Sequence, residues 1–225
     1  MLLIVSLFLT AVRPAATHKR VVCYVPTYDE SWGDNAAHVL DTLPAACSHI
    51  NLAFALETKG KFDPSGLGSI DAAAKASAHK LQQGGAKILV SIGGWSGRND
   101  WKKIKNTTQF ANDAVKYLST WGTGNSKGLD GLDLDVESDL SKTTEIIIAL
   151  VKDIRKAAAD HPGFLISWAG WMGGADTSSS ADPSQDCTKV MHAVGADIDC
   201  KLQHRLACVT FPFIHLPFHV LHSQT

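Results

Sequence analysis

Short apolar runs alternate with longer segments of helical periodicity along most of this 225-residue chain. The apolar runs are centred near Val22, Ile50, Leu89, Leu132 and Ile166. Between them, apolar residues recur every three to four positions, most clearly over 69–81, 110–121 and 147–158, and each of these segments is followed by glycine or proline, as is typical of a helix end. Alternating strands and helices predict a parallel sheet with helical crossovers. This pattern by itself does not choose between a doubly wound sheet and a barrel.

One strand-like run carries an unusual set of acids: Asp130-Gly131-Leu132-Asp133-Leu134-Asp135-Val136-Glu137. Because side chains alternate along a strand, Asp133, Asp135 and Glu137 share one face and the apolar residues share the other. Neighbours on one face lie roughly 6.6 Å apart along the strand. Three carboxyl groups this close do not all ionise cheaply, so at least one should hold a proton near neutral pH. Such a group suits general acid catalysis.

The alternative interpretation of this run is an exposed strand with a solvated acidic face. However, no Lys or Arg lies within the run, and the apolar alternate positions suit a parallel strand covered by helices. Asp130 has the opposite parity to the other three acids. We therefore interpret Asp130 as a structural residue at the strand start.

The spacing of the four acids resembles the D-x-x-D-x-D-x-E signature of glycoside hydrolase family 18, the chitinases and their non-catalytic chitinase-like relatives. Residues 21–24, 47–55 and 87–95 resemble the family's first three strands in order, and the third contains its S-x-G-G pattern. The resemblance runs from about Arg20 to about Asp199 and implies a (β/α)8 TIM barrel, an α/β fold. Such a barrel needs about 250 residues. We therefore expect an incomplete, C-terminally truncated barrel with about five to six of the eight strand–helix units, formed by residues 17–199 and followed by a divergent tail over 200–225.

The resemblance also implies an activity, namely endo-type hydrolysis of β-1,4-linked N-acetylglucosamine polymers such as chitin or chito-oligosaccharides. The mechanism is substrate-assisted and retaining, and it needs no metal or organic cofactor. In the catalytic set, Glu137 is the general acid, Asp135 orients the 2-acetamido group, and Asp133 shares a proton with Asp135. The substrate-binding positions carried over from the family are Tyr24, Tyr28, Phe54, Gly94 and Trp95. Each of these aromatic residues has core or rim packing as its alternative role, and Gly94 a strand-ending turn.

The second half of the family pattern is missing from this sequence. The family's sixth strand carries a Met-x-Tyr-Asp-like segment, yet no tyrosine follows Tyr117, and the late sugar-stacking tryptophan is also missing. Losing one preorganised donor of this kind costs ~10²–10³ in rate. Two alternatives therefore stay open: a non-catalytic chitin- or glycan-binding lectin, and a fragment without function. Glu137 favours the enzyme, because non-catalytic relatives commonly lose this acid.

Composition narrows the range of partners. The formal net charge is −1, which provides no electrostatic basis for binding nucleic acid or an anionic membrane surface. His215, His219 and His222 have helical spacing for a metal, but Pro212 and Pro217 interrupt that helix, so we expect no metal site. We expect a monomer.

The N-terminus and the cysteines indicate the compartment. Residues 2–12 form an apolar run of signal-peptide length, so we expect a signal peptide over residues 1–16 and secretion; a buried strand or an uncleaved anchor is the alternative. No second long apolar run exists, so we expect no transmembrane helix. Five cysteines suit an oxidising compartment. The family resemblance implies a Cys23–Cys47 disulfide, and Asn106 begins a glycosylation sequon.

Overall fold

The computed structural model describes residues 20–27, 36–68, 70–94, 100–122, 128–170, 187–203, 207–208 and 219–222. Within these ranges, one curved sheet contains six parallel strands in the spatial order β1-β2-β4-β5-β6-β7. Their bounds are β1 Val21–Pro26, β2 His49–Thr58, β4 Lys87–Gly93, β5 Gly131–Asp135, β6 Leu165–Gly170 and β7 Cys200–Gln203. The five strands expected from the apolar runs are confirmed, and β7 adds a sixth. The sheet is part of a (β/α)8 barrel.

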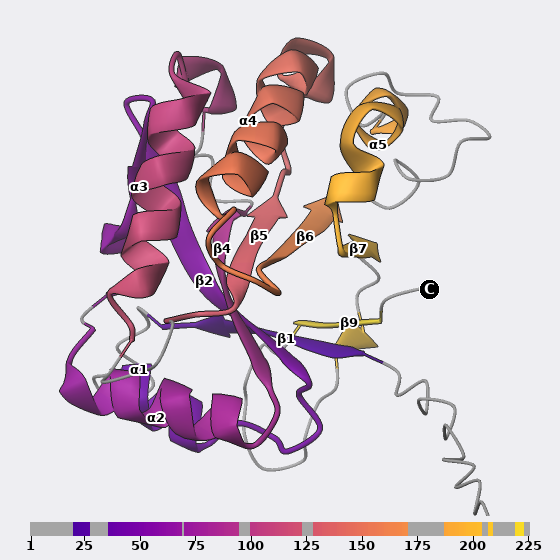
Figure 1. The fold of residues 1–225 in the computed structure, drawn as a ribbon. Helices are drawn as coiled ribbons and strands as arrows, with labels where there is room; N and C mark the ends of the chain where they lie inside the picture. Colours follow the sequence, from indigo (N-terminus) through magenta and orange to yellow (C-terminus); the bar gives the residue numbers. More distant parts are fainter. Residues whose placement is uncertain are drawn as a thin grey trace, which may run out of the picture.

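Helices follow the strands and cover the outer side of the sheet (Figure 1). They are α1 Ala36–Asp41, α2 Ala72–Gln83, α3 Thr107–Ser119, α4 Thr144–Ala157 and α5 Thr188–Val194. The three helices expected from apolar periodicity correspond to α2, α3 and α4. The helix starts have a local cause: Asp71 and Asn106 each cap a helix by accepting a hydrogen bond from a backbone N–H in its first turn.

Three short strands were not expected from the sequence. β3 (Lys61–Asp63) forms an antiparallel hairpin with β2. β9 (His219–His222) lies antiparallel to β1, and β8 (Ala207–Cys208) pairs with β9. The segment 200–225, expected as a divergent tail, therefore contains β7, β8 and β9.

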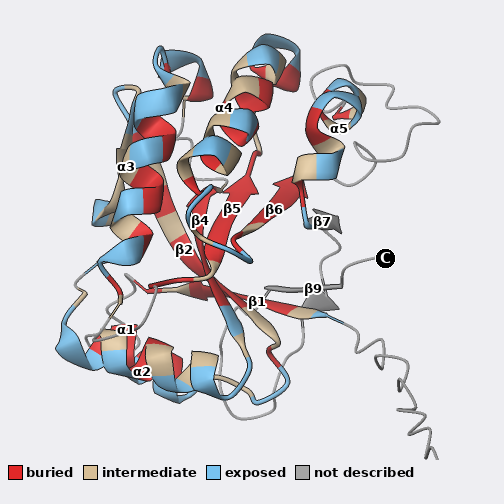
Figure 2. Ribbon diagram, in the orientation of Figure 1, coloured by how far each residue is buried: buried red, intermediate tan, exposed pale blue. Residues whose placement is uncertain are grey.

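The core divides into an outer and an inner part. A large apolar cluster fills the space between the strands and the helices, and it includes Leu132, Leu134 and Val136. A small second cluster, Val22, Tyr24, Ala53 and Ala169, lies on the inner side of the strands. Figure 2 shows strands that are buried along most of their length and helices that are buried only on the side facing the sheet. This layered burial leaves the inner side of the strands for polar residues that hydrogen-bond to one another.

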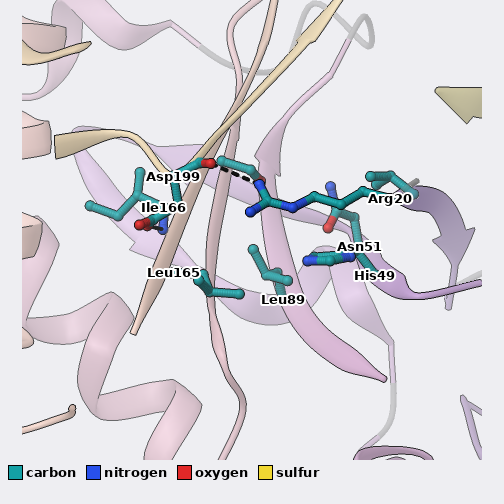
Figure 3. A pocket seen from close by; sticks show the side chains of 9 residues that line it. Arg20, His49, Asn51, Leu89, Leu165, Ile166 and Asp199 are labelled. Carbon is teal, nitrogen blue, oxygen red and sulfur yellow. Dashed lines mark hydrogen bonds between the residues drawn. The ribbon is translucent and has the colours of Figure 1, made fainter. Parts of the chain in front are cut away.

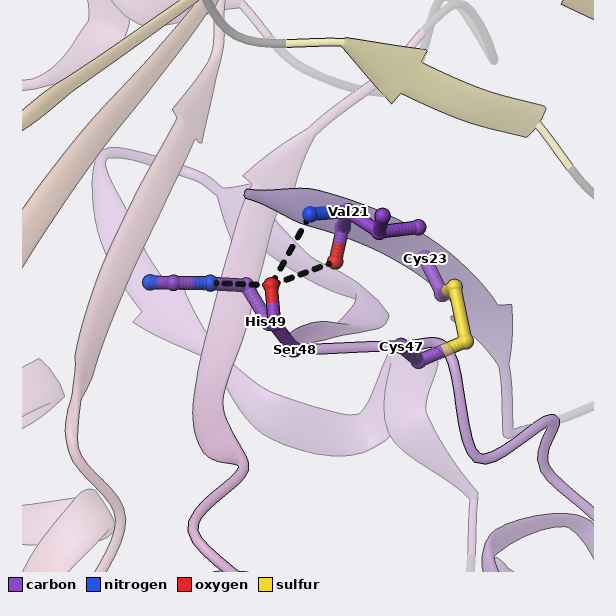
Figure 4. The surroundings of a disulfide bond; sticks show 5 residues. All are labelled: Val21, Cys23, Cys47, Ser48 and His49. Atoms are coloured by element: carbon purple, nitrogen blue, oxygen red, sulfur yellow. Dashed lines mark hydrogen bonds between the residues drawn. A yellow bond between two sulfur atoms is a disulfide. The ribbon is translucent and has the colours of Figure 1, made fainter. Parts of the chain in front are cut away.

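A disulfide connects the first two strands. Cys23 in β1 and Cys47, just before β2, are bonded with their Cα atoms 5.7 Å apart, as the family resemblance implied (Figure 4). Beside the disulfide, the Val21 N–H donates a hydrogen bond to the Ser48 hydroxyl over 2.8 Å. The disulfide and this hydrogen bond together hold the register at the amino end of the barrel.

No helix within the described ranges is long and apolar enough to cross a bilayer. The expected signal segment 1–16 lies outside the described residues.

Candidate active site

Strand β5 carries the acidic residues. All of its residues are buried, and Asp133 and Asp135 are only 0% and 1% exposed. Because Leu134 and Val136 belong to the outer apolar cluster, alternation leaves Asp133 and Asp135 on the inner side of the sheet. Glu137 follows two residues after the end of β5, has the same parity, and is half-buried. Asp133, Asp135 and Glu137 thus form a row that runs from the barrel interior to the carboxyl ends of the strands, where the active sites of barrel enzymes lie.

Asp133 accepts hydrogen bonds from hydroxyl groups on three different strands. Tyr24 of β1 donates to Oδ2 over 2.6 Å, and Ser91 of β4 donates to the same oxygen over 2.7 Å. Ser167 of β6 donates to Oδ1 over 2.5 Å. Hydrogen bonds to an ionised acceptor are among the strongest in proteins. The three donors therefore stabilise a negative charge on the buried Asp133 carboxylate.

Ser167 was not singled out from the sequence. Strand register could have identified it, because Asp133 lies directly between Ser91 and Ser167 on the neighbouring strands. The alternation that places Asp133 on the inner side of β5 also places Ser167 on the inner side of β6.

Tyr24 is held as a donor by its surroundings. Burial, and then the charges of Asp133 and Asp135, raise the pKa of the Tyr24 phenol well above its usual value of 10.0. The phenol therefore keeps its proton throughout the neutral range and can only donate to Asp133. The structure does not test the sugar contact predicted for Tyr24; it shows that the Tyr24 hydroxyl binds the Asp133 carboxylate.

The two glycines at the end of β4 allow close backbone contact with β5. Gly93 has φ +120°, and a Cβ there would lie 2.0 Å from the Asp135 carbonyl oxygen. Gly94 donates its N–H to the same oxygen over 3.0 Å. A Cβ on Gly94 would lie 3.0 Å from the Phe54 ring. The space next to these two glycines is therefore taken by the β5 backbone and by the Phe54 ring.

The other substrate-binding predictions are only partly described. Phe54 is partly buried, and its ring centroid lies 6.1 Å from that of the buried Tyr24, so the two rings pack together on the inner side of β1 and β2. Tyr28 and Trp95 lie outside the described residues.

Asp130 has the structural role that its parity predicted. It pairs with Lys87 over 3.0 Å, and it accepts hydrogen bonds from the Gln82 side chain over 2.7 Å and from the Ile88 N–H over 3.0 Å. These contacts tie the start of β5 to β4 and α2. The Asp130 carboxylate is therefore engaged in contacts that fix the strand start.

In the described part of the chain, no group of three or more His, Cys, Asp or Glu side chains could hold a metal ion. His219 and His222 lie on β9, and His215 lies outside the described residues.

Comparison with known proteins identifies relatives of this fold. A model of the family described as Glycosyl hydrolases family 18 matches residues 20–198. Among solved structures, the chain is similar to a family 18 chitinase from Pseudoalteromonas aurantia (TM-score 0.61, 18% identity, covering 81% of this chain and 65% of that one). It is also similar to a fungal endo-β-N-acetylglucosaminidase of family 18 (TM-score 0.56, 20% identity, 81% and 65%). A third is a mutant of Ostrinia furnacalis Group II chitinase catalytic domain 2 in complex with penta-N-acetylchitooctaose (TM-score 0.56, 21% identity, 81% and 49%).

These structures share the fold of this chain but are longer. The chain spans 65% of the length of the first two proteins and 49% of the third. The matched region, 20–198, contains β1 to β6 and all of the acids described above.

Proposed function

Because this chain belongs to glycosyl hydrolase family 18, we propose that it is a chitinase-like glycosidase. Its substrate is chitin or a chito-oligosaccharide, and it cleaves the β-1,4 bond between N-acetylglucosamine units with retention of configuration, as an endo-acting enzyme. The observation that carries the proposal is the arrangement along β5. The buried Asp133 carboxylate accepts hydrogen bonds from hydroxyls on three strands. Asp135 and Glu137 follow it toward the carboxyl end of the barrel.

Glu137 is the proposed general acid. It is half-buried at the strand end, so it can meet a bound substrate while part of its solvation is removed. Burial of this kind favours the protonated form of a carboxyl group, which is the form that donates a proton to the glycosidic oxygen. Once the leaving group has departed, Glu137 takes a proton from the water that completes hydrolysis.

Asp133 and Asp135 form the proposed supporting pair. Hydrogen bonds from hydroxyl groups favour the ionised form of Asp133. Two adjacent acids do not both ionise cheaply, so the proton that they share is held by Asp135. Asp135 then orients the 2-acetamido group, whose oxygen attacks the anomeric carbon. The resulting oxazolinium intermediate is opened by water.

A chitin-binding lectin is the second candidate. It is favoured by the lack of any tyrosine after Tyr117, since the corresponding family tyrosine holds the acetamido oxygen. A lectin needs an accessible aromatic ring such as the partly buried Phe54, but it does not need proton transfer by Glu137.

Chromophore release from an aryl glycoside of chitobiose tests the two candidates. Glu137→Gln should lower the rate at least ~10²-fold, because a positioned general acid contributes about that much. Glu145→Gln is the matched control: its side chain is 74% exposed on α4, and the variant should keep the original rate. Release that survives Glu137→Gln contradicts the proposed mechanism. No release by the unaltered chain, with retained binding to chitin, supports the lectin.

Secretion and glycosylation complete the proposal. Removal of residues 1–16 leaves a secreted monomer whose catalytic part is 17–199. Asn106 is exposed, and its Oδ1 accepts a hydrogen bond from the Gln109 N–H over 2.9 Å, so it caps α3 through the oxygen while the amide nitrogen is the atom that a glycan would modify. Protein secreted from eukaryotic cells should begin at residue 17, elute as a monomer, and shift on enzymatic deglycosylation. Asn106→Asp keeps the capping oxygen and should abolish only the shift.

A further inference from the structure

A small cavity lies inside the barrel, on the amino-terminal side of Asp133. Two residues that line it, Leu89 and Leu165, are in register with Gly131, which precedes Asp133 by two positions on β5. The volume of the cavity is about 10 Å³, which is room for one water molecule. It is lined by Arg20, Val22, His49, Asn51, Leu89, Leu165, Ile166, Ser167 and Asp199, and Figure 3 shows the Arg20 side chain extending past His49 and Asn51 to Asp199.

Asn51 brings a buried donor to this cavity. The residue is only 1% exposed, and its Nδ2 has no hydrogen-bond partner within the described part of the chain. Burial and the charges of Asp133 and Asp135 raise the pKa of the Tyr24 phenol, and the approach of the Asn51 side chain opposes part of that rise. Because the Tyr24 hydroxyl gives its proton to Asp133, the amide must present its N–H side to the phenol. The amide nitrogen has a second N–H, and buried donors in native proteins are nearly always paired with protein groups or water.

Ser167 brings an acceptor to the same cavity. Its hydroxyl has a single proton, which it donates to Oδ1 of Asp133. Toward the cavity, the Ser167 oxygen can therefore only accept a hydrogen bond. The cavity is thus adjacent to the network that holds the buried carboxylate.

His49 brings a second acceptor, and the contacts of Ser48 decide which ring nitrogen it is. The Ser48 hydroxyl donates to the Val21 carbonyl oxygen over 3.1 Å and lies 3.0 Å from Nδ1 of His49 (Figure 4). Since the serine proton goes to Val21, Nδ1 of His49 carries the proton in its contact with Ser48. In the neutral ring, Nε2 then has no proton and can accept a hydrogen bond.

Neutral groups therefore form the polar lining of the cavity. Burial, and then the charges of Arg20 and Lys87, lower the pKa of His49 below the usual 6.5, with Asp130 opposing, so the ring is uncharged at pH 7. Arg20 is exposed to solvent, and its Nη1 donates to the Asp199 carbonyl oxygen over 2.9 Å. A ligand at this position must accept from one neutral group and donate to two others.

We propose that the cavity binds one water molecule, which accepts from Nδ2 of Asn51 and donates to Oγ of Ser167 and Nε2 of His49. Three hydrogen bonds are the usual number for a buried water. A halide ion cannot donate to the serine or the histidine, and a metal cation cannot accept from the amide. The water connects β2 to β6 across the inside of the barrel.

This water gives Asn51 a role in the reaction, which rests on the proposed function. A hydrogen bond received by the Ser167 oxygen polarises its O–H group and strengthens the bond that this group donates to Asp133. Asn51 is therefore a positioning residue: it acts through the water and Ser167 to keep Asp133 ionised, so that the proton of the pair stays on Asp135.

A high-resolution crystal structure of the full chain tests the water without any measurement of activity. It should show one density peak within about 2.7–3.2 Å of Nδ2 of Asn51, Oγ of Ser167 and Nε2 of His49. Nitrogen-15 NMR should show the His49 proton on Nδ1. A cavity without density, or a proton on Nε2, would overturn the proposal.

Thermal denaturation of Asn51→Leu provides a second test, because leucine has a similar volume but no donor. If the amide is bonded to water, the variant should lower Tm by about 2–4 °C. If the amide is unpaired, its removal should leave Tm unchanged or raise it, which contradicts the water. Asn112→Leu is the matched control, since Asn112 is exposed on α3 and its replacement should change Tm far less.

The pH dependence of kcat/KM tests the positioning role with the chitobiose glycoside. Asp133 is faced by Tyr24 and by Asp135, and both are retained in Asn51→Leu. Weaker stabilisation of the Asp133 charge raises the apparent pKa of the pair, so the acidic limb should move to higher pH by roughly 0.5 unit, whereas Asn112→Leu should keep the original limb. An unmoved limb in Asn51→Leu would refute the positioning role. Absence of chromophore release by the unaltered chain would instead contradict the proposed function, and the crystal structure would still decide the water.

Discussion

Replacing Tyr24 by phenylalanine removes one of the three hydroxyls that hold Asp133, and the consequence can be worked out from the structure. The ring is 5% exposed, and its hydroxyl lies 2.6 Å from Oδ2 of Asp133. Phenylalanine preserves the packed volume, so almost the whole effect comes from the lost hydrogen bond to a buried charge. Such bonds contribute about 1.5–3 kcal/mol. Because Ser91 continues to donate to the same oxygen, we expect a loss near the lower end of that range.

Urea denaturation provides the measurement. The expected loss of about 1.5–2 kcal/mol in the free energy of unfolding corresponds to a decrease of roughly 3–8 °C in Tm for a chain of this size. Tyr117→Phe is the matched control, since Tyr117 is half-buried on α3, burial raises its pKa, and its side-chain hydrogen bond is with the neutral Trp121 and not with a carboxylate. The control should lower stability by about 1 kcal/mol or less, the usual contribution of a hydrogen bond between neutral groups.

Alkaline pH provides a second measurement of the same contact. The pKa of Tyr24 is raised in the folded state, so its contribution to stability is complete below pH 10.0, the usual value, and is lost as pH rises toward the folded value. The unaltered chain should therefore lose stability above pH 10 more steeply than Tyr24→Phe. Equal stability of the two proteins at neutral pH, or equal alkaline slopes, would refute the assignment of Tyr24 as a donor to Asp133.

Three further perturbations follow from the described contacts. Glu57→Ala removes a 1% exposed carboxylate that accepts two backbone N–H groups, and it should cost about 2–4 kcal/mol in urea denaturation because both donors are left unpaired; a loss below about 1 kcal/mol would contradict this. Gly93→Ala should prevent folding or lower Tm far more than Gly85→Ala, since a Cβ at 93 meets a backbone oxygen whereas nothing lies within 4 Å at 85, although both have positive φ. Reduction of Cys23–Cys47, a bond across a sequence separation of 24, should lower the free energy of unfolding by about 3 kcal/mol, and an unchanged Tm in reductant would show that the bond does not stabilise the fold.

Much of the barrel was readable from the chain because its signals are local. A strand or helix that buries one or two of its faces has apolar residues at regular intervals, either in a short continuous run or with a period of 3.6 residues. These patterns can be recognised in the sequence alone. The β3 hairpin was not predicted, because β3 pairs with the last residues of β2, beyond the part of β2 that pairs within the barrel. The sequence of β2 resembles one continuous apolar strand and does not indicate this extension. The pairing of β9 with β1 was not predicted for a different reason. The two strands are about 200 residues apart in the chain, so their antiparallel pairing leaves no local sequence pattern.

By itself, the sequence determined the inward face of β5, because alternation depends only on strand geometry, and it identified the family from the spacing of the four acids. Only the tertiary structure decided what surrounds those acids. Tyr24, Ser91 and Ser167 lie far apart in the chain and converge on Asp133 because strand order and register bring β1, β4 and β6 around β5. The side on which a residue points is a property of one strand, whereas a hydrogen-bond network is a property of the packing of several strands.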